Sequence, residues 1–481
     1  MKKYESISLQ LQTLITQQAF KIDDVFLSIR EVADLYQVGI NTAYQALQQL
    51  EDAGYLKAKH RVGYVVAMRP HTSSARVGAF SFSGIQELAQ RATLIRQWAQ
   101  AARQAHKRMD LATGDPAAYL NSLLQATVYK IIRSDPTVLT RYVAFDGLFE
   151  LRQKMSGRYR QLGCDISPES ILLTHGATQA LSLALQATLN QGDWVLVESP
   201  TYFGFLQILE SLKLNVVSMT IDPAKGIEPD YLLEVIEQSR AQGKIIKACL
   251  LQANFQNPTG CSIAPAVRSQ ILDVFHQHQI IVIEDDTFRE LSHGSELEQT
   301  QPVQPLKAFD RYNNVILCGS LSKLIAPGFR VGFIHGAAAH EKIKTLFHAT
   351  NIGCDELSQR VISHIYPKKF LAHLEQSKQI YRANMDAITQ AIKTYFPKGT
   401  QVNPYAGGYL LWVILPTSID TNALFDMALN AHSISFAPGS LFSTDVQHAS
   451  ALRINAAAFG SSFDLDDIRM LGELALSLLH V

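Results

Sequence analysis

One lysine is distinguished by its neighbours. Residues 319–332 read Gly-Ser-Leu-Ser-Lys-Leu-Ile-Ala-Pro-Gly-Phe-Arg-Val-Gly and follow an apolar run. A lysine at a strand end can form an imine with an aldehyde once it loses its proton. The hydroxyls of Ser320 and Ser322 and the guanidinium of Arg330 are suited to binding a phosphate. Pyridoxal phosphate (PLP) is an aldehyde that carries a phosphate, so the run predicts a PLP pocket at Lys323. The alternative is a surface lysine in a Ser/Gly loop.

A second phosphate-binding segment precedes it. Residues 171–181 read Ile-Leu-Leu-Thr-His-Gly-Ala-Thr-Gln-Ala-Leu, which predicts a strand, a turn at Gly176 and the start of a helix. The free N–H groups of Ala177 and Thr178, with the Thr178 hydroxyl, would bind a phosphate at the positive end of that helix. An ordinary strand-to-helix turn has the same pattern.

Two further segments offer groups for a pyridine ring. Asn257 opens a rigid Asn-Pro-Thr-Gly turn and could donate to the phenolic oxygen of the cofactor, although a plain Pro-Gly turn would also fit. An apolar run ends in Glu284, Asp285 and Asp286, and a carboxylate there can keep the ring nitrogen protonated. We favour Asp285 because it stands three residues before the aromatic Phe288. The alternative is that these acids cap a following helix.

Aromatic and cationic residues could complete the pocket. Tyr202 or Phe203, just beyond an expected strand, could stack on the ring, although a core aromatic is an equal possibility. Arg453, in Leu-Arg-Ile-Asn, could bind the α-carboxylate of a substrate through two parallel hydrogen bonds. A surface arginine is the alternative.

The elements that must position these residues follow an α/β pattern. Apolar runs alternate with helical patterns from about residue 110, which predicts a mostly parallel sheet. The expected strands begin at Ile171, Trp194, Val216, Ala248, Ile280, Val315 and Val331. From about residue 355 the order helix, short strands at 408–413 and helix predicts a smaller α+β lobe.

The first 68 residues have a different pattern. Ser28 and Glu31 fit a capping box that opens a helix through about Tyr36, and we expect this helix to bury Val32, Ala33 and Leu35. A second helix is expected from about Asn41 to Asp52, with an apolar face of Ala43, Ala46, Leu47 and Leu50. A basic hairpin over 55–66, turning near 61–63, completes a winged helix-turn-helix.

This zone resembles the GntR-type winged helix. The matching segments are Ser28-Ile-Arg-Glu-Val-Ala, Val38-Gly-Ile-Asn-Thr-Ala, Leu50-Glu-Asp-Ala-Gly-Tyr-Leu and Arg61-Val-Gly-Tyr-Val-Val. The resemblance implies that Asn41, Thr42, Tyr44, Gln45 and Gln48 face the major groove of double-stranded DNA. It also implies that Ser28, Arg30, Lys57, Lys59 and Arg61 approach phosphates or the minor groove. A small helical cap or dimerisation arm is the alternative.

The rest of the chain, about 110–481, resembles the fold-type-I PLP family of aspartate-aminotransferase-like proteins. Its most specific motifs are Ser320-x-Ser-Lys-x-x-x-Pro-Gly-x-Arg, Asn257-Pro-Thr-Gly and Glu284-Asp-Asp. The resemblance implies that Lys323 and Asp285 are catalytic, that Tyr202 stacks on the ring and that Tyr142 reaches the phosphate of a neighbouring subunit in a homodimer. Phe288 stands where many members carry a tyrosine whose hydroxyl also bonds the phenolic oxygen.

The order of the parts resembles the MocR-type regulators. Expected are a DNA-binding domain at 1–68, a linker with an amphipathic helix (85–108) at 69–109 and an aminotransferase-like domain at 110–481. The large lobe would span about 140–350 and the small lobe about 351–481. The implied function is a transcriptional regulator that senses PLP, or an amino acid or amine, through an external aldimine. The alternative is an active aminotransferase of the 2-aminoadipate-like kind.

The composition of the chain bears on its broad class of protein and on its location. The chain has 481 residues, 47% hydrophobic and 18% charged, which is typical of a soluble globular protein. Its 43 basic and 43 acidic residues leave no net charge to attract nucleic acid as a whole. Five scattered cysteines indicate neither a disulfide framework nor a metal site. With no apolar leader or span, we expect a cytoplasmic protein without a membrane partner.

Overall fold

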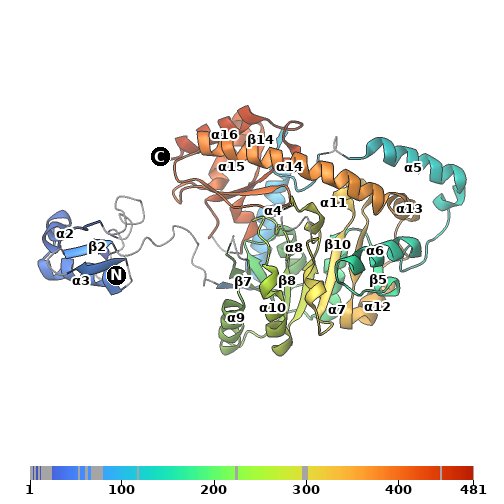
Figure 1. Cartoon of the computed structure of the whole chain (residues 1–481), viewed down its shortest axis with the longest axis horizontal. Helices are drawn as coiled ribbons and strands as arrows, with labels where there is room; N and C mark the ends of the chain where they lie inside the picture. The colour runs from blue at the N-terminus through green and yellow to red at the C-terminus, as the bar shows by residue number, and fades with distance from the viewer. Residues whose placement is uncertain are drawn as a thin grey trace. The chain divides into compact units, whose positions relative to one another are not determined.

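The structure is a computed structural model, and it is described for residues 4, 7, 8, 11, 24–52, 55–59, 63–66, 80–115, 119–222, 226–294, 302–444 and 447–479, except for the side chains of Asp52 and Ser322. The chain divides into two compact units, Met1–Ala75 and Arg76–Val481 (Figure 1). Within the described ranges, no helix combines the length and the apolar character needed to cross a membrane.

The first unit contains a helix pair and a hairpin. Helices α2 (Ile29–Leu35) and α3 (Ile40–Asp52) precede the antiparallel strands β1 (Leu56–Lys59) and β2 (Gly63–Val66). The expected capping box begins α2, because the Ser28 Oγ accepts from the Glu31 N–H at 3.3 Å and Glu31 Oε2 accepts from the Ser28 N–H at 2.7 Å. The winged-helix arrangement predicted for this zone is therefore confirmed.

The core of this unit lies between the helices and the hairpin. Val32 and Ala33 of α2 are buried, whereas Leu35 is 59% exposed, so the expectation that Leu35 is buried is wrong. Helix α2 ends at Leu35, and among the described residues this side chain at the end of the last turn does not join the core cluster. The four residues expected on the apolar face of α3 are all buried: Ala43, Ala46, Leu47 and Leu50.

An eight-stranded sheet organises the second unit. The strand order is β3-β7-β6-β8-β9-β10-β11-β5. The five strands from β7 to β10 are parallel, while β11 is antiparallel to both its neighbours and β3 is antiparallel to β7. The predicted mostly parallel α/β sheet is thus confirmed. The strands are β3 (Phe80–Ser83), β5 (Ile171–Thr174), β6 (Trp194–Ser199), β7 (Asn215–Thr220), β8 (Ile246–Leu251), β9 (Ile281–Asp285), β10 (Val315–Ser320) and β11 (Gly332–His335).

Helices cover both faces of this sheet (Figure 1). Alternate side chains of β6 divide between two cores: Val195 and Val197 pack on one face, and Leu196 packs on the other. The first face holds α7 (Ala177–Thr188), α8 (Phe203–Ser211) and α12 (His340–Thr350), and the second holds α9 (Pro229–Ala241) and α10 (Pro265–Gln277). Because both faces are covered, the strands are mostly apolar.

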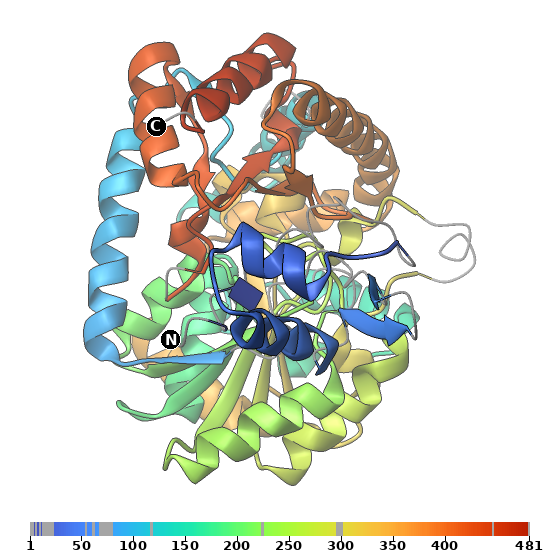
Figure 2. The same cartoon turned by 90° about the vertical axis from the view of Figure 1, so that its left-hand side faces the viewer.

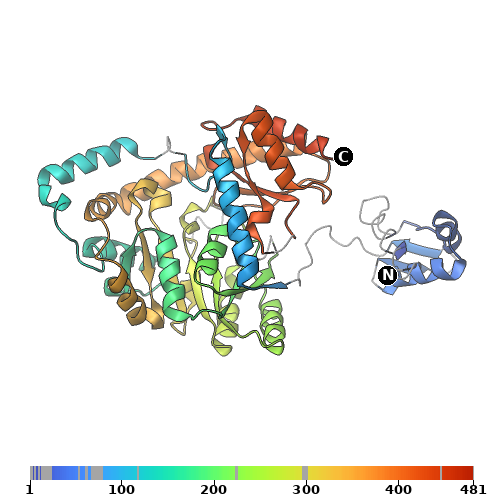
Figure 3. The same ribbon diagram turned by 180° about the vertical axis from the view of Figure 1, so that it is seen from behind.

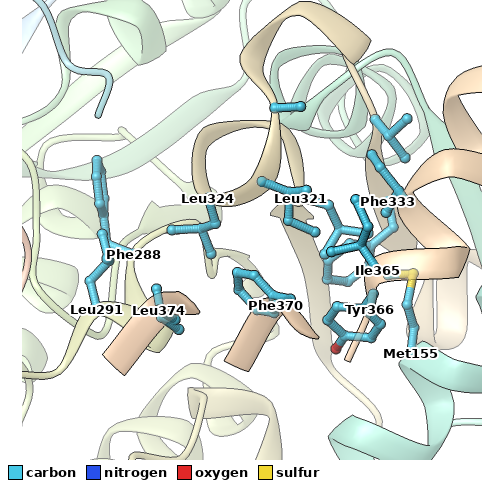
Figure 4. Close-up of a cluster of buried hydrophobic side chains, with 14 of the residues drawn as sticks. Met155, Phe288, Leu291, Leu321, Leu324, Phe333, Ile365, Tyr366, Phe370 and Leu374 are labelled. Carbon is cyan, nitrogen blue, oxygen red and sulfur yellow. The ribbon is translucent and has the colours of Figure 1, made fainter. Parts of the chain in front are cut away.

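A third cluster lies beneath the short helix α11 (Ser322–Ile325), which carries the predicted cofactor lysine. Figure 4 shows Leu321 and Leu324, which flank the Ser322–Lys323 pair, among Phe288, Phe370 and other apolar side chains. Both leucines are less than 10% exposed. Their burial anchors the turn from which Lys323 projects. The surrounding helices are α5 (Asn121–Ser134), α6 (Phe149–Gln161), α13 (Glu356–Ile365) and α14 (Lys368–Tyr395).

The small lobe combines a sheet with helices, which confirms the predicted smaller α+β lobe (Figure 2). Its strand order is β12-β13-β16-β15, all antiparallel. The strands are β12 (Gln401–Val402), β13 (Leu410–Ile414), β15 (Ala437–Pro438) and β16 (Ala451–Asn455), and the helices are α15 (Thr421–His432), α16 (Leu465–Ser477) and the end of α14. Strand β16 carries Arg453.

The start of the second unit contains more structure than its composition indicated. Phe80–Ser83 lies in a stretch with linker composition, yet it forms β3 at the edge of the large sheet. The helix expected over 85–108 is α4 (Ile85–Ala102), which ends six residues earlier because Lys107–Arg108 pairs with β14 (Ile434–Ser435) as strand β4. Figure 3 shows α4 running from the edge of the large sheet to the small lobe.

Candidate functional site

The pocket forms where parallel strands end. Asp285 ends β9 and Ser320 ends β10, and because parallel strands share one carboxyl edge, the polar residues that follow them meet there. Lys323 projects into the same place. Its Nζ lies 5.0 Å from the centroid of the Phe288 ring and 5.5 Å from that of Tyr202. The structure thus brings an amine, a carboxylate and two aromatic rings together.

Lys323 has the properties of a reactive amine. The pKa of Lys323 is lowered to about 8, chiefly by burial; the charge of Asp285 opposes this shift, and the charges of Arg453 and Arg330 add to it. A lysine with this pKa is partly neutral near physiological pH, and only the neutral amine can attack an aldehyde. The surface-loop alternative for this lysine therefore does not fit its surroundings.

Asp285 is held by polar neighbours. Burial raises the pKa of Asp285, while hydrogen bonds from Thr287 and the charge of Lys323 favour its ionised form. Gln252 donates to Asp285 Oδ2 at 3.0 Å, and the Gln252 Oε1 accepts from the Asn257 N–H at 2.8 Å. Gln252 was not predicted from the sequence. The only signal for it is that it is the first polar residue after β8.

The neighbouring acids have other partners. Asp286 forms a buried ion pair with Arg289 at 2.8 Å, and Glu284 accepts from the backbone of Leu306 and Lys307 at 2.6 and 2.8 Å. Asp285 is therefore the acid of the Glu284–Asp286 run whose carboxylate lies beside Lys323, as its position before Phe288 had suggested.

Arg453 crosses from the small lobe to this pocket. Its side chain is 0% exposed, and Nη1 donates to Asn257 Oδ1 at 3.0 Å while Nη2 donates to the Asp110 carbonyl. Among the described residues no carboxylate pairs with this guanidinium. A buried charge without a counter-ion is costly, so this arrangement suits a ligand that brings a carboxylate.

Two buried donors in the pocket have no partner within the described residues: Asn257 Nδ2 and Arg453 Nε. Buried polar groups are almost always satisfied, so these two are expected to meet groups that the protein itself does not supply. A pyridine ring with a phenolic oxygen and a carboxylate-bearing amine would supply such groups.

The residues predicted to bind phosphate lie around the start of α7. Gly176 adopts a φ of +84°, and a Cβ built there would lie 2.6 Å from Arg330 Nη2, so the guanidinium lies against the helix N-terminus. Gly332 permits the approach of β11, because a Cβ on it would lie 2.4 Å from the Gly176 carbonyl carbon. Ala177 and Thr178 begin α7, and Ser320 is buried at the end of β10. The Ser322 side chain lies outside the described residues.

Tyr142 lies apart from these groups in its own chain. Its side chain is 83% exposed, between α5 and α6. Other apolar residues nearby are exposed too, including Phe145 (50%) and Ile352 (64%). The Phe145 ring lies 5.2 Å from that of His348, so residues 142–149 adjoin 348–352 on one surface.

The predicted DNA-contacting residues form an exposed face. Asn41, Tyr44, Gln45 and Gln48 are exposed and Thr42 is partly exposed, opposite the buried face of α3. Ser28, Arg30, Lys57 and Lys59 are exposed as well, although the Ser28 hydroxyl is engaged in capping α2. Arg61 lies outside the described residues.

Comparison with known proteins agrees with both parts. Residues 106–468 match the family described as aminotransferase class I and II, and residues 3–66 match the bacterial regulatory proteins of the gntR family. The chain is 31% identical over 476 residues to an uncharacterized HTH-type transcriptional regulator, YdcR, of Escherichia coli strain K12, covering 98% of this chain and 99% of that one.

Relatives that carry aminotransferase names match a smaller share of this chain. The 2-aminoadipate transaminase of Thermus thermophilus is 29% identical over 73% of this chain and 85% of its own. The crystal structure of LysN, an α-aminoadipate aminotransferase of that organism complexed with N-(5'-phosphopyridoxyl)-L-leucine, superposes with a TM-score of 0.70 at 25% identity, over 82% of this chain and 97% of that one.

The fold and these neighbours indicate PLP as the cofactor, and the residues present fit it. Lys323 would hold its aldehyde, Asp285 its ring nitrogen, the free Asn257 amide its phenolic oxygen and the start of α7 its phosphate. When bound, PLP supplies an electron-accepting ring to an amine attached at its aldehyde carbon. Through residues 106–468 the chain belongs to the class I and II aminotransferase family, and with its gntR-family helix-turn-helix it has the MocR-type architecture of transcriptional regulators.

Proposed function

We propose that the protein binds promoter DNA through its winged helix and that an amino acid or amine bound in the PLP pocket changes its affinity for that DNA. The observation that carries the effector part is Arg453, which is buried beside the amine of Lys323 and pairs with no carboxylate among the described residues. A ligand with both an amine and a carboxylate satisfies both groups at once. PLP itself is the second candidate signal.

In this proposal the two faces of α3 have separate tasks. The buried face holds the unit together, and Asn41, Thr42, Tyr44, Gln45 and Gln48 read base edges in the major groove, where Asn and Gln can pair with adenine. The exposed Lys57 and Lys59 of the hairpin, with Arg30, Ser28 and Arg61, approach phosphates or the minor groove. No lysine or arginine occurs between Gln37 and Tyr55, so phosphate contacts depend on these flanking residues.

We also propose that the protein is a homodimer and cytoplasmic. The exposed apolar surface around Tyr142, Phe145 and Ile352 supports a dimer, because burying it would remove these side chains from water. Tyr142 of each subunit would then reach the phosphate in the other. Phe145→Asp is expected to shift the sedimentation coefficient towards the monomer, whereas Tyr129→Asp on exposed α5 is the control. A wild-type protein that sediments as a monomer at micromolar concentration would contradict the dimer.

The decisive experiment measures DNA and ligand together. PLP-loaded protein is titrated with each of the twenty amino acids while its binding to DNA from upstream of its own gene is followed by fluorescence anisotropy. At least one amino acid is expected to change both the PLP absorbance and the DNA affinity. DNA binding that no ligand alters, with or without PLP, would count against the proposal.

Amino transfer is the second candidate function, because the residues that would react with an amino acid are present: Lys323, Asp285 and Asn257. The position that would supply a second hydrogen bond to the phenolic oxygen is Phe288, a bare ring at 2% exposure. We expect a spectral change with little turnover. Sustained 2-oxo acid production over many turnovers, without an effect on DNA binding, would favour the enzyme instead.

A further inference from the structure

We propose that helix α4 positions the guanidinium of Arg453, with Trp98 and Arg91 as the positioning residues, so that a carboxylate bound at Arg453 is transmitted to α4. The inference deepens the proposed function and rests on it, since it names the element that couples the ligand to the chain leading from the winged helix. It is built from contacts within the second unit alone.

Two aromatic rings confine the Arg453 side chain. The guanidinium carbon lies 5.7 Å from the centroid of the Phe203 ring and 5.1 Å from that of Phe442. The two rings lie 5.3 Å apart. Cation–π contacts of this kind are strongest when they are desolvated, and Arg453 is fully buried. The orientation of the guanidinium therefore depends on where these two rings stand.

Helix α4 supports the first ring. The Trp98 ring packs edge-on against Phe203 with 5.5 Å between centroids, and the Trp98 Nε1–H donates to the Phe436 carbonyl at 3.0 Å. That hydrogen bond fixes the indole, because Nε1 is the one donor of the side chain. A displacement of α4 must move Trp98 and with it the surroundings of Phe203.

The same helix holds the segment that carries the second ring. Phe442 belongs to the short helix η8 (Gly439–Phe442), and Arg91 Nη1 donates to the Ser440 carbonyl of that helix at 3.0 Å. The Phe442 carbonyl in turn accepts from the Thr201 N–H at 2.7 Å, next to Tyr202. Arg91 thus ties α4 to the wall of the pocket through one charge-assisted hydrogen bond.

The segment that follows α4 contacts the same arginine. After strand β4, the Met109 N–H donates to the Ser435 carbonyl at 2.8 Å, and the Asp110 carbonyl accepts from Arg453 Nη2. Side chains of α4 therefore support the rings around Arg453, and the segment after α4 contacts Arg453 directly.

Helix α4 also joins both lobes. Leu88 packs with the helices of the large lobe, while Ile95 and Ala102 pack in two clusters of the small lobe. Figures 2 and 3 show α4 running from strand β3 up to the small lobe. β3 is the first element described after β2 of the winged helix. A shift of the residues around Arg453 is thus passed to α4, which directly follows β3 on the chain leading from the DNA-binding unit. Coupling between two sites is reciprocal, so a change in the position of α4 must in turn alter the affinity of Arg453 for a carboxylate.

The test compares ligands that differ only in the carboxylate. Full-length PLP-loaded protein is titrated, by PLP absorbance, with each of the twenty amino acids and with the matching amine, beginning with L-alanine and ethylamine. Trp98→Ala and Arg91→Gln are each expected to weaken binding of the responsive amino acid, raising its Kd by about tenfold. PLP loading and the affinity for the amine should stay as in the wild type. Trp98→Phe should restore most of the loss.

Arg96→Gln is the matched control, because Arg96 lies exposed on the same helix and bonds only its neighbour Thr93 among the described residues. Equal loss for amino acid and amine, or no loss for either, would overturn the inference. If the variants behave as expected but DNA binding ignores the ligand, the positioning role stands and the proposed function fails. If wild-type DNA binding responds and the α4 variants respond identically, only the inference fails. A wild type whose absorbance responds to nothing overturns both.

Discussion

The polar side chains of α3 that we expect to meet DNA, such as Gln45 and Gln48, are exposed and point away from their own unit. Those of the pocket are buried: Asp285 is 6%, Asn257 1% and Arg453 0% exposed. The exposed set can be changed one residue at a time with little effect on folding. The buried set is linked by hydrogen bonds through Gln252, so removing one member leaves another without its partner.

This difference predicts two kinds of mutational result. In the pocket, changes should abolish ligand binding while the winged helix keeps its affinity for DNA. In the winged helix, changes should reduce DNA binding by increments while the pocket keeps its cofactor. The following experiments test that separation, beginning with the largest effect.

Lys323→Ala is expected to abolish covalent retention of PLP, because Lys323 is the amine at the pocket with a pKa lowered to about 8. The visible absorbance should be lost after dialysis, while DNA affinity without ligand stays unchanged. Lys307→Ala, at a buried lysine paired with Asp310, serves as a comparison that should keep the absorbance. Persistence of the absorbance in Lys323→Ala would remove Lys323 from this role.

Arg453→Gln should weaken binding of the responsive amino acid by about 2–5 kcal/mol, which is more than about 30-fold in Kd, because a buried charge pair with the ligand is lost. The matching amine, which has no carboxylate, should bind as it does to the wild type. Absorbance titrations give both values. An equal loss for the two ligands would mean that Arg453 supports the pocket without binding the carboxylate.

Gln45→Ala should cost about 1–3 kcal/mol on the natural promoter and almost nothing on unrelated DNA, as expected for a base-reading residue. Fluorescence anisotropy with the two DNAs measures the difference, and PLP absorbance checks the pocket. Equal losses on both DNAs would place Gln45 at the phosphate backbone instead.

The rate of PLP capture by the apoprotein should rise with pH and level off above about pH 8. Burial lowers the pKa of Lys323, so its neutral form, which is the nucleophile, dominates above about 8 instead of above its ordinary pKa. Below that pH the rate should fall by about tenfold per pH unit. Stopped-flow absorbance from pH 7 to 9 measures the profile. A rate that continues to rise well above pH 9 would contradict the lowered pKa.

Lys59→Gln should have the smallest effect. We expect weaker binding on every DNA sequence and a slope of log K against log salt that is reduced by about one, because one phosphate contact is lost. The exposed Lys57 beside it on β1 provides a second measurement of the same kind. An effect confined to one sequence would contradict a phosphate role.

Much of the fold was readable from local patterns. Apolar runs placed seven strands of the large sheet close to their observed positions, because buried parallel strands are continuously apolar. Strand β3 was missed since Phe80–Ser83 is short and lies in a polar, glycine-containing stretch. Leu35 was misjudged because helical periodicity identifies a face but not whether anything packs over its last turn. Helix α4 was expected to run past its end, since pairing with β14 across more than 300 residues decides where it stops.

Residue types and spacing by themselves predicted that Lys323, Asp285 and Asn257 serve one chemistry, because each stands at or after the end of a strand and each suits one part of a phosphorylated pyridine aldehyde. They also determined the capping box and the two-faced helix α3, which are local features. Only the tertiary structure decided that Arg453, from the small lobe, is fully buried against Asn257 and that Gln252 links Asn257 to Asp285. It also decided that Trp98 and Arg91 support the rings around Arg453. Contacts between distant segments depend on how the lobes pack, and no local pattern encodes that packing.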